Sequence, residues 1–427
     1  MDQTGKLPPQ IGKRLFKAVG PGVVTGAADD DPSGIATYSI AGAQLGTHLL
    51  WTACLTWPLM AFVQMMCARI GMVTGMGLAR ALEKKFSRRL VIVVSMVLLC
   101  ANTINIGSDL AGMGDALEVL TGIPAEVFIA PMGFGIMWAT IFLRFEQIEN
   151  TLKWLAGILL VYVVTAFLLP IDWSEVLVAT VVPSVPDGPD AWAALVAILG
   201  TTISPYLFFW QTGEEIEDAK AIGRTDSGDK SVSPAQMTER ALDVGLGTFF
   251  SNIVMYFIIL TTAMTLHRAG ITNIDSSKEA ALALRPLAGD LASILYAVGI
   301  LGVGFLAIPT LAGSAAYAMA ESFHWNEGLD EKFRTASRFY SVIIVSIAIG
   351  MSMSLLDVNP MKALFWTAVM NGVLAPFLLV GILSIATDTV IMRGQPSSRV
   401  SVVMVGMTTL LMFAAAIGMF VLQVAGR

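Results

Sequence analysis

The chain has 427 residues, of which 55% are hydrophobic and 14% are charged, and its mean hydropathy is +0.72. This composition excludes an ordinary soluble domain, in which roughly 25% of residues are charged. Apolar runs of about 20 residues have the length of a helix that crosses a bilayer, whereas a β-barrel would show shorter alternating segments. We therefore predict an all-α polytopic membrane protein. The net charge of −6 leaves its orientation open, because topology depends on where Lys and Arg lie.

Apolar runs bounded by Gly, Pro and charged residues predict eleven membrane-spanning helices. Their approximate ranges are 18–45, 49–75, 90–116, 123–143, 152–170, 191–217, 241–265, 289–321, 337–357, 361–387 and 399–424. Most of the 26 Lys and Arg residues lie in alternate connecting segments, beginning with the N-terminal one. The segments on the opposite side hold only Arg268, Lys278, Arg285, Lys362 and Arg427. This distribution predicts a cytoplasmic N-terminus and an outer C-terminus, in what we expect to be a bacterial cytoplasmic membrane.

The first predicted span contains three consecutive acids, Asp29, Asp30 and Asp31, followed by a proline and, two residues later, a glycine. A charged side chain at the bilayer centre costs about 3 kcal/mol, so such groups usually face a cavity or a partner. Pro32 removes a backbone donor and Gly34 tolerates non-helical dihedral angles, so we predict that the helix breaks here. Asp31 is a candidate cation ligand, with an N-cap as the alternative. Asp29 and Asp30 are candidates for an ion or proton path.

Two later spans carry single polar residues within apolar sequence. Asp109 in the third span is a candidate for an ion or proton path, and the alternative is a structural ion pair with Arg338 or another base. Asn371 in the tenth span is a candidate to line the same site.

A second interrupted segment lies in the sixth span, where small polar residues precede Pro205. Ser204 offers a hydroxyl, and Thr201 offers a hydroxyl or a carbonyl, as oxygen ligands. The alternative is that these side chains bond to their own helix backbone. Tyr206 and Gln211 follow in the same span and are candidates to line the site.

The two interrupted spans are five apart, which suggests an internal repeat of five helices. Because five is odd, the second copy must be inverted in the membrane, and paired breaks in inverted repeats mark a binding site near the midplane. We therefore predict one transmembrane transporter domain over 1–427. Repeat one covers about 18–170, repeat two about 191–387, and an extra helix about 399–424.

These motifs resemble those of the NRAMP divalent metal-ion transporters. The family's first helix carries Asp-Pro-Gly-Asn, its sixth Met-Pro-His and its third Thr-Asp-Leu-Ala-Glu. The matching stretches here are Asp31-Pro32-Ser33-Gly34, Ser204-Pro205-Tyr206 and Ser108-Asp109-Leu110-Ala111-Gly112. The resemblance implies a LeuT-type fold with a metal ion at the two breaks. It also implies Asp31 as the ligating carboxylate, with the carbonyls of Ala28 and Thr201 completing the site.

The departures from the family pattern bear on the ion. Gly34 stands in place of a ligating Asn, Ser204 of Met, Tyr206 of His and Gly112 of Glu. Loss of the thioether removes the ligand that favours soft transition metals, and we expect the smaller side chains to enlarge the pocket for a hydrated ion. The replacements are similar to those of the NRAMP-related magnesium transporter branch. We predict transport of Mg²⁺, with Mn²⁺ also carried, and weak or absent proton coupling, because the His and the Glu are missing.

Four alternatives remain open at this stage. A proton-coupled Mn²⁺/Fe²⁺ symporter keeps both fold and site, and an organic-solute transporter keeps the fold, although Asp31 would repel a carboxylate substrate. The stretch Gly112-Met113-Gly114-Asp115 matches the GxGD motif of intramembrane aspartyl proteases, but no Tyr-Asp partner motif accompanies it. A channel is the fourth. For the favoured interpretation we expect the divalent ion and the lipid bilayer as partners, with no cofactor, no nucleic acid, no obligate protein partner and no enzymatic activity.

Overall fold

The computed structural model describes residues 30–143, 157–221, 232–329, 331–353, 356 and 358–426. Each of the eleven predicted spans contains helix. The helices are α3 (Pro32–Leu45), α4 (Trp51–Thr74), α6 (Arg88–Thr121), α7 (Glu126–Phe142), η1 (Gly157–Leu160) with α9 (Val161–Leu168), α11 (Pro189–Thr202), α12 (Pro205–Ala221), α13 (Pro234–Thr265), α16 (Ala292–Phe323), α17 (Ser337–Met353), α18 (Pro360–Ala386) and α19 (Arg399–Ala425). Seven helical stretches in the described part are long and apolar enough to cross a membrane, and three shorter apolar helices accompany them.

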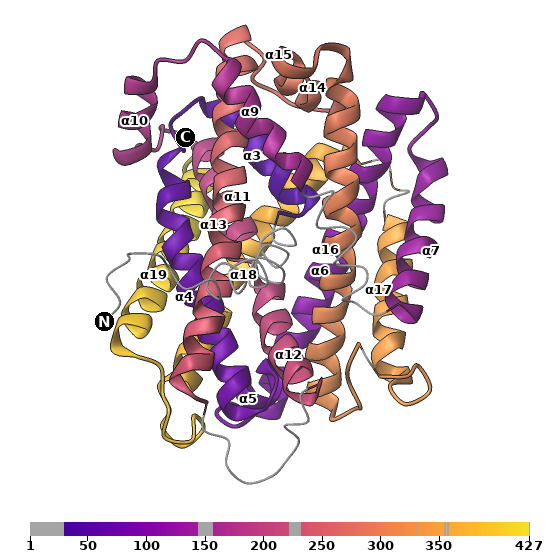
Figure 1. The fold of residues 1–427 in the computed structure, drawn as a ribbon, viewed down its shortest axis with the longest axis vertical. Coiled ribbons are helices and arrows are strands. Elements are labelled where there is room, and N and C mark those ends of the chain that lie inside the picture. The colour runs from indigo at the N-terminus through magenta and orange to yellow at the C-terminus, as the bar shows by residue number, and fades with distance from the viewer. Residues whose placement is uncertain are drawn as a thin grey trace, which may run out of the picture.

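Short helices gather at the two ends of the bundle (Figure 1). They are α5 (Leu78–Glu83) at the lower end and α10 (Trp173–Val181), α14 (Ser277–Ala281) and α15 (Arg285–Ala288) at the upper end, together with η2 (His267–Ala269), η3 (Leu282–Leu284) and η4 (Gly289–Leu291).

Ion pairs join three connecting segments that the charge pattern assigns to one side of the membrane. Arg80 lies 3.1 Å from Glu327, and Lys85 lies 2.8 Å from Asp388. These contacts bring the segment after α4, the segment after α16 and the segment after α18 to the same end of the bundle. The side of the membrane that this end faces stays a prediction.

The two predicted helix breaks lie at the start of α3 and between α11 and α12. Helix α11 ends at Thr202, Ile203 has φ −121° and ψ 61°, and Pro205 begins α12. The break in the sixth span is therefore confirmed, and its cause is the missing N–H of Pro205. In the first span, α3 begins at Pro32 with Asp31 in extended backbone geometry. The preceding half of that span, with Ala28 and Asp29, lies outside the described residues.

Helix α3 lies in the centre of the bundle and packs against α13, α18, α11 and α6 (Figure 1). Every residue from Pro32 to Ala43 is buried. Small residues let the neighbouring backbones approach closely: a side chain at Gly200 of α11 would collide with the Ala368 carbonyl and with Gly372 of α18. This packing fixes the position of α11, and with it the start of the break, against α18.

Candidate cation site

Asp31 forms the polar centre at the start of α3. Its Oδ1 accepts hydrogen bonds from the Ser33 hydroxyl at 2.6 Å and from the Gly34 N–H at 2.7 Å, which makes it the N-cap of the helix. Its Oδ2 accepts a bond from Asn105 Nδ2 on α6 at 3.0 Å. The residue is only 2% exposed. The capping role is thus observed, whereas the ligand role stays a prediction that a remaining lone pair on Oδ2 permits.

The second break presents oxygens that are bonded within their own segment. The Ser204 hydroxyl donates to the carbonyls of Gly200 and Thr201, both at 2.7 Å, and the Thr201 hydroxyl donates to the Ile198 carbonyl at 3.0 Å. These side chains therefore bond to the backbone of their own helix, as the alternative interpretation predicted. The hydroxyl oxygen of Ser204 keeps its lone pairs, and a carbonyl has two, so a role for Ser204 and Thr201 as ligands stays a prediction.

Tyr38 links the two breaks, and the sequence interpretation missed it. The hydroxyls of Thr201 and Tyr38 are hydrogen-bonded to each other at 3.1 Å. A Cβ placed on Gly34 would lie 3.4 Å from Tyr38 Cε2, an ordinary van der Waals contact. The tyrosine ring thus borders the space beside Gly34, and the expectation that Gly34 widens the pocket stays a prediction. The spacing of four residues between Gly34 and Tyr38, which stacks them on one helix face, could have revealed this.

The remaining acids lie close by but are not equivalent. Asp30 Oδ1 accepts a bond from the Ser251 hydroxyl of α13 at 3.1 Å, while its Oδ2 has no hydrogen-bond partner within the described part of the chain. Neither carboxylate oxygen of Asp109 has one there either. The predicted alternative partner of Asp109, Arg338, instead lies 5.7 Å from the ring of Trp325.

The predicted lining residues divide into two groups. Tyr206 on α12 and Asn371 on α18 are buried, and Asn371 is adjacent in sequence to the glycine that contacts α11. Gln211 instead donates to Glu215 Oε1 at 2.9 Å. It therefore belongs to an ion-pair cluster further along α12, and its predicted place at the site stays untested.

That cluster ties α12 to α13. Arg240 Nε lies 2.7 Å from Glu215, and the same guanidinium reaches Asp218 at 2.5 Å and Asp243 at 3.2 Å. The Glu215 side chain is 2% exposed. With the Arg80–Glu327 pair, these bonds hold together the end of the bundle that carries α5 (Figure 1).

Gly112, which stands where the family motif has Glu, lies at a close contact between two helices. A Cβ on Gly112 would come within 2.8 Å of Leu364 on α18, so this position faces an apolar helix contact. Asp115, the acid of the GxGD match, accepts the Ser277 N–H at 2.7 Å and so helps to hold the start of α14. Gly112 thus serves the packing of α6 against α18, and Asp115 serves the hydrogen bonding of α14.

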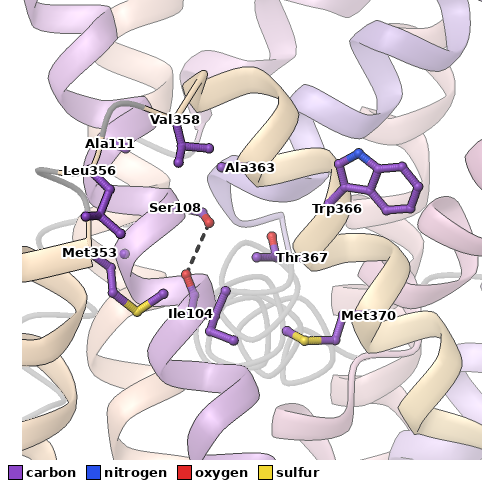
Figure 2. A pocket seen from close by; sticks show the side chains of 11 residues that line it. Ile104, Ser108, Ala111, Met353, Leu356, Val358, Ala363, Trp366, Thr367 and Met370 are labelled. Atoms are coloured by element: carbon purple, nitrogen blue, oxygen red, sulfur yellow. Dashed lines mark hydrogen bonds between the residues drawn. The ribbon is translucent and has the colours of Figure 1, made fainter.

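A cavity of about 310 Å³ lies between α6, the end of α17 and α18 (Figure 2). Its lining is apolar apart from two hydroxyls, and the Ser108 hydroxyl donates to the Ile104 carbonyl of its own helix at 3.1 Å. Trp366 and Leu356 at its rim are exposed. A cavity without charged or carbonyl-rich lining does not suit a cation, so it is separate from the candidate site.

No group of three or more His, Cys, Asp or Glu side chains that could hold a metal ion occurs in the portion of the chain described. The oxygens that the described residues present at the breaks are the carboxylate of Asp31, the hydroxyls of Ser204 and Thr201, and the backbone carbonyls that these hydroxyls contact. Such an all-oxygen set is the kind that hard divalent cations prefer.

Comparison with known proteins gives consistent matches over most of the chain. The family model described as natural resistance-associated macrophage protein-like (Nramp) matches residues 22–422. The divalent metal cation transporter MntH of Erwinia tasmaniensis is 26% identical over 319 residues, which are 73% of this chain and 74% of the relative. The MntH of Caldanaerobacter subterraneus is 24% identical over 390 residues, which are 89% and 87% of the two chains.

Solved structures show the same fold. A manganese transporter of Eremococcus coleocola aligns with a TM-score of 0.74 at 20% identity, over 96% of this chain and 87% of that chain. A nucleobase-cation-symport-1 family transporter in a closed conformation aligns with a TM-score of 0.55 at 14% identity, over 90% and 80%. These likenesses confirm the predicted LeuT-type fold of two inverted repeats.

Proposed function

Because the chain belongs to the Nramp family, we propose that it carries Mg²⁺, with Mn²⁺ as a second substrate, across the membrane by alternating access. The coarser statement, a divalent metal cation transporter that is not an enzyme, follows from the family and from relatives named as divalent metal cation transporters. The intramembrane protease is therefore dropped as an alternative. We place the ion at the two helix breaks, with Asp31 as the carboxylate ligand.

The preference for Mg²⁺ rests on the chemistry of the second break. Ser204 brings a hydroxyl oxygen to the position where the family motif has a thioether, and the Gly200 and Thr201 carbonyls lie 2.7 Å from it. Without a sulfur ligand, the site loses the interaction that favours soft transition metals. Hard oxygens with retained water suit Mg²⁺, which dehydrates reluctantly.

Weak or absent proton coupling is the second part of the proposal. The two titratable residues of the family motif are replaced by Tyr206, which is buried, and by Gly112, which packs against Leu364. Asp109, the acidic residue of the third-helix motif, is retained in this chain. A pathway for protons needs a succession of groups that titrate near neutral pH, and these substitutions remove two of them.

The test is uptake of Mg²⁺, Mn²⁺ and Ca²⁺ into proteoliposomes that contain a pH-sensitive dye. We expect saturable Mg²⁺ and Mn²⁺ uptake with little acidification inside. Acidification that accompanies Mn²⁺ uptake, with Mg²⁺ excluded, would instead establish the proton-coupled Mn²⁺/Fe²⁺ symporter.

Two substitutions at Asp31 separate its two roles. Asp31→Ala removes both the cap and the carboxylate, whereas Asp31→Ser keeps a good N-cap and removes only the charge. We expect neither variant to transport, while Asp31→Ser retains the thermal stability of the wild type to within about 1 kcal/mol. Normal uptake by either variant would refute the assignment of Asp31.

A substitution at Ser204 tests the argument that the hard oxygen ligands favour Mg²⁺. Ser204→Met restores a thioether at the second break, and we expect the ratio of Mn²⁺ to Mg²⁺ uptake to rise. An unchanged ratio in a variant that elutes as a folded monodisperse protein would contradict the argument. Thr202→Val, which changes a neighbouring hydroxyl bonded to the Ile198 carbonyl, is the control.

A further inference from the structure

Helix α6 presents two chemically different faces at the level of Asp31. Ile104, Ser108 and Ala111 line the apolar cavity beside α17 and α18 (Figure 2). Asn102, Asn105 and Asp109 share another face, because spacings of three and four residues place side chains on one side of a helix.

The polar face of α6 contacts α16 and α3. Asn102 Nδ2 donates to the Leu311 carbonyl and to the Ser314 hydroxyl, both at 2.9 Å. One turn further along, Asn105 Nδ2 donates to Asp31 Oδ2 at 3.0 Å. Since a carboxylate accepts hydrogen bonds, the amide must turn its NH₂ group to Asp31, and its carbonyl oxygen is left over.

Three oxygens on this face lack hydrogen-bond partners among the described residues. They are Asn105 Oδ1 and both carboxylate oxygens of Asp109, on side chains that are 0% exposed. Buried polar atoms are nearly always hydrogen-bonded, so three such acceptors on successive turns call for an explanation. Hydrogen-bond donors would satisfy these three oxygens, and so would a bound cation.

The charge distribution favours a cation. Asn105, which bonds Asp31 Oδ2 at 3.0 Å, lies one turn from Asp109 on the same face of α6, so two carboxylates of like charge adjoin one polar cluster. In a buried site the repulsion between like charges is strong, because the surroundings screen it weakly. A doubly charged ion between them would balance both negative charges, whereas a monovalent ion would leave one uncompensated.

We infer that Asn105 Oδ1 and the Asp109 carboxylate bind the transported cation together with Asp31 Oδ2. Helix α6 then supplies the oxygens that Gly34 and Ser204 do not provide in place of the longer side chains of the family motif. The inference rests on the proposed function and deepens it, because it names the ligands that select a divalent over a monovalent ion. It also gives Asp109 a direct role in binding.

The test compares Mn²⁺ and Mg²⁺ uptake by the full-length protein in proteoliposomes, with binding of Mn²⁺ measured calorimetrically. The variants are Asn105→Leu, Asn105→Asp and Asp109→Asn. Ser108→Ala is the matched control, because it lies next to Asp109, faces the apolar cavity and bonds only its own helix. Thermal unfolding of each purified variant establishes that it is folded.

We expect Asn105→Leu and Asp109→Asn each to raise the KM for Mn²⁺ at least tenfold, and Ser108→Ala to leave it within twofold. Asn105→Asp distinguishes a ligand from a residue that merely positions Asp31. It keeps an oxygen but loses the NH₂ donor, so retained binding supports ligation, and binding as weak as in Asn105→Leu overturns it.

A KM within twofold of wild type in folded Asp109→Asn also overturns the inference. In crystals soaked with Mn²⁺, the anomalous peak should lie within about 2.0–2.6 Å of oxygens from all three residues. A peak that contacts Asp31 but not α6 would leave the proposed function standing and remove this inference. If the wild type transports no divalent ion, the proposed function itself fails.

Discussion

Replacing Arg240 tests whether buried ion pairs hold the α5 end of the bundle together. Arg240→Ala would leave Glu215, whose side chain is 2% exposed, with Gln211 at 2.9 Å as its remaining side-chain hydrogen-bond donor shown in the structure. Removing one partner of a buried ion pair costs about 3–5 kcal/mol, because the other charge stays buried without compensation.

The size of the effect on the melting temperature follows from the chain length. An unfolding entropy of about 2.1 cal/mol/K per residue gives about 0.9 kcal/mol/K for 427 residues. The substitution should therefore lower the melting temperature by about 3–6 °C. Thermal unfolding of the purified protein, followed by intrinsic fluorescence, measures this change.

An exposed ion pair at the same end provides the control. The Lys85 and Asp388 side chains are 41% and 23% exposed, so Lys85→Ala should cost no more than about 1 kcal/mol. The double variant Arg240→Ala with Glu215→Gln removes the stranded charge and should recover much of the loss. The reasoning is refuted if Arg240→Ala destabilises the protein no more than Lys85→Ala does.

Three further predictions test other parts of the structure. Tyr38→Phe removes the hydroxyl that is hydrogen-bonded to Thr201. We expect about 1 kcal/mol of destabilisation and a raised KM for the ion. An unchanged KM would show that Tyr38 does not contribute to the site. Gly200→Val should abolish monodisperse expression, because the new side chain would collide with the α18 backbone. Gly406→Val is the control and should be tolerated, because the space around Gly406 is open. Equal yields of the two variants would contradict the packing of α11 against α18. Burial raises the pKa of Glu327 from 4.5 to about 7, so the folded protein holds this proton more tightly than the unfolded chain, and stability should fall as pH rises between these values. Glu327→Gln should flatten that pH dependence in thermal scans, and an unchanged slope would contradict the assignment.

The fold could be predicted from the sequence because its determinants are local. Apolar runs set the positions of the helices, and the break before Pro205 follows from one missing N–H. The pairs of Arg80 and Lys85 bring three of the segments that carry Lys and Arg to the α5 end, and the side of the membrane that they face stays a prediction. Each of these signals can be read from a short window of residues.

The surroundings of the site could not be predicted in the same way, because they depend on contacts between helices. Asn105 is 74 residues from Asp31 in sequence, and nothing in its own span indicates that the two bond. Tyr38 and Thr201 are likewise 163 residues apart. The effect of Gly34 on the pocket likewise depends on a neighbour, the ring of Tyr38, and stays a prediction.

The two oxygens of Asp31 explain how one residue can serve both as a cap and as a ligand. A helix N-terminus carries a partial positive charge, which would repel a cation placed beside α3. Oδ1 accepts the Gly34 N–H and so offsets that charge, while Oδ2 points to Asn105 on α6. Serine at this position could cap the helix but would leave the positive end of α3 facing the ion. We therefore expect cation binding to require the carboxylate even where the helix itself would accept a hydroxyl, and Asp31→Ser measures this distinction.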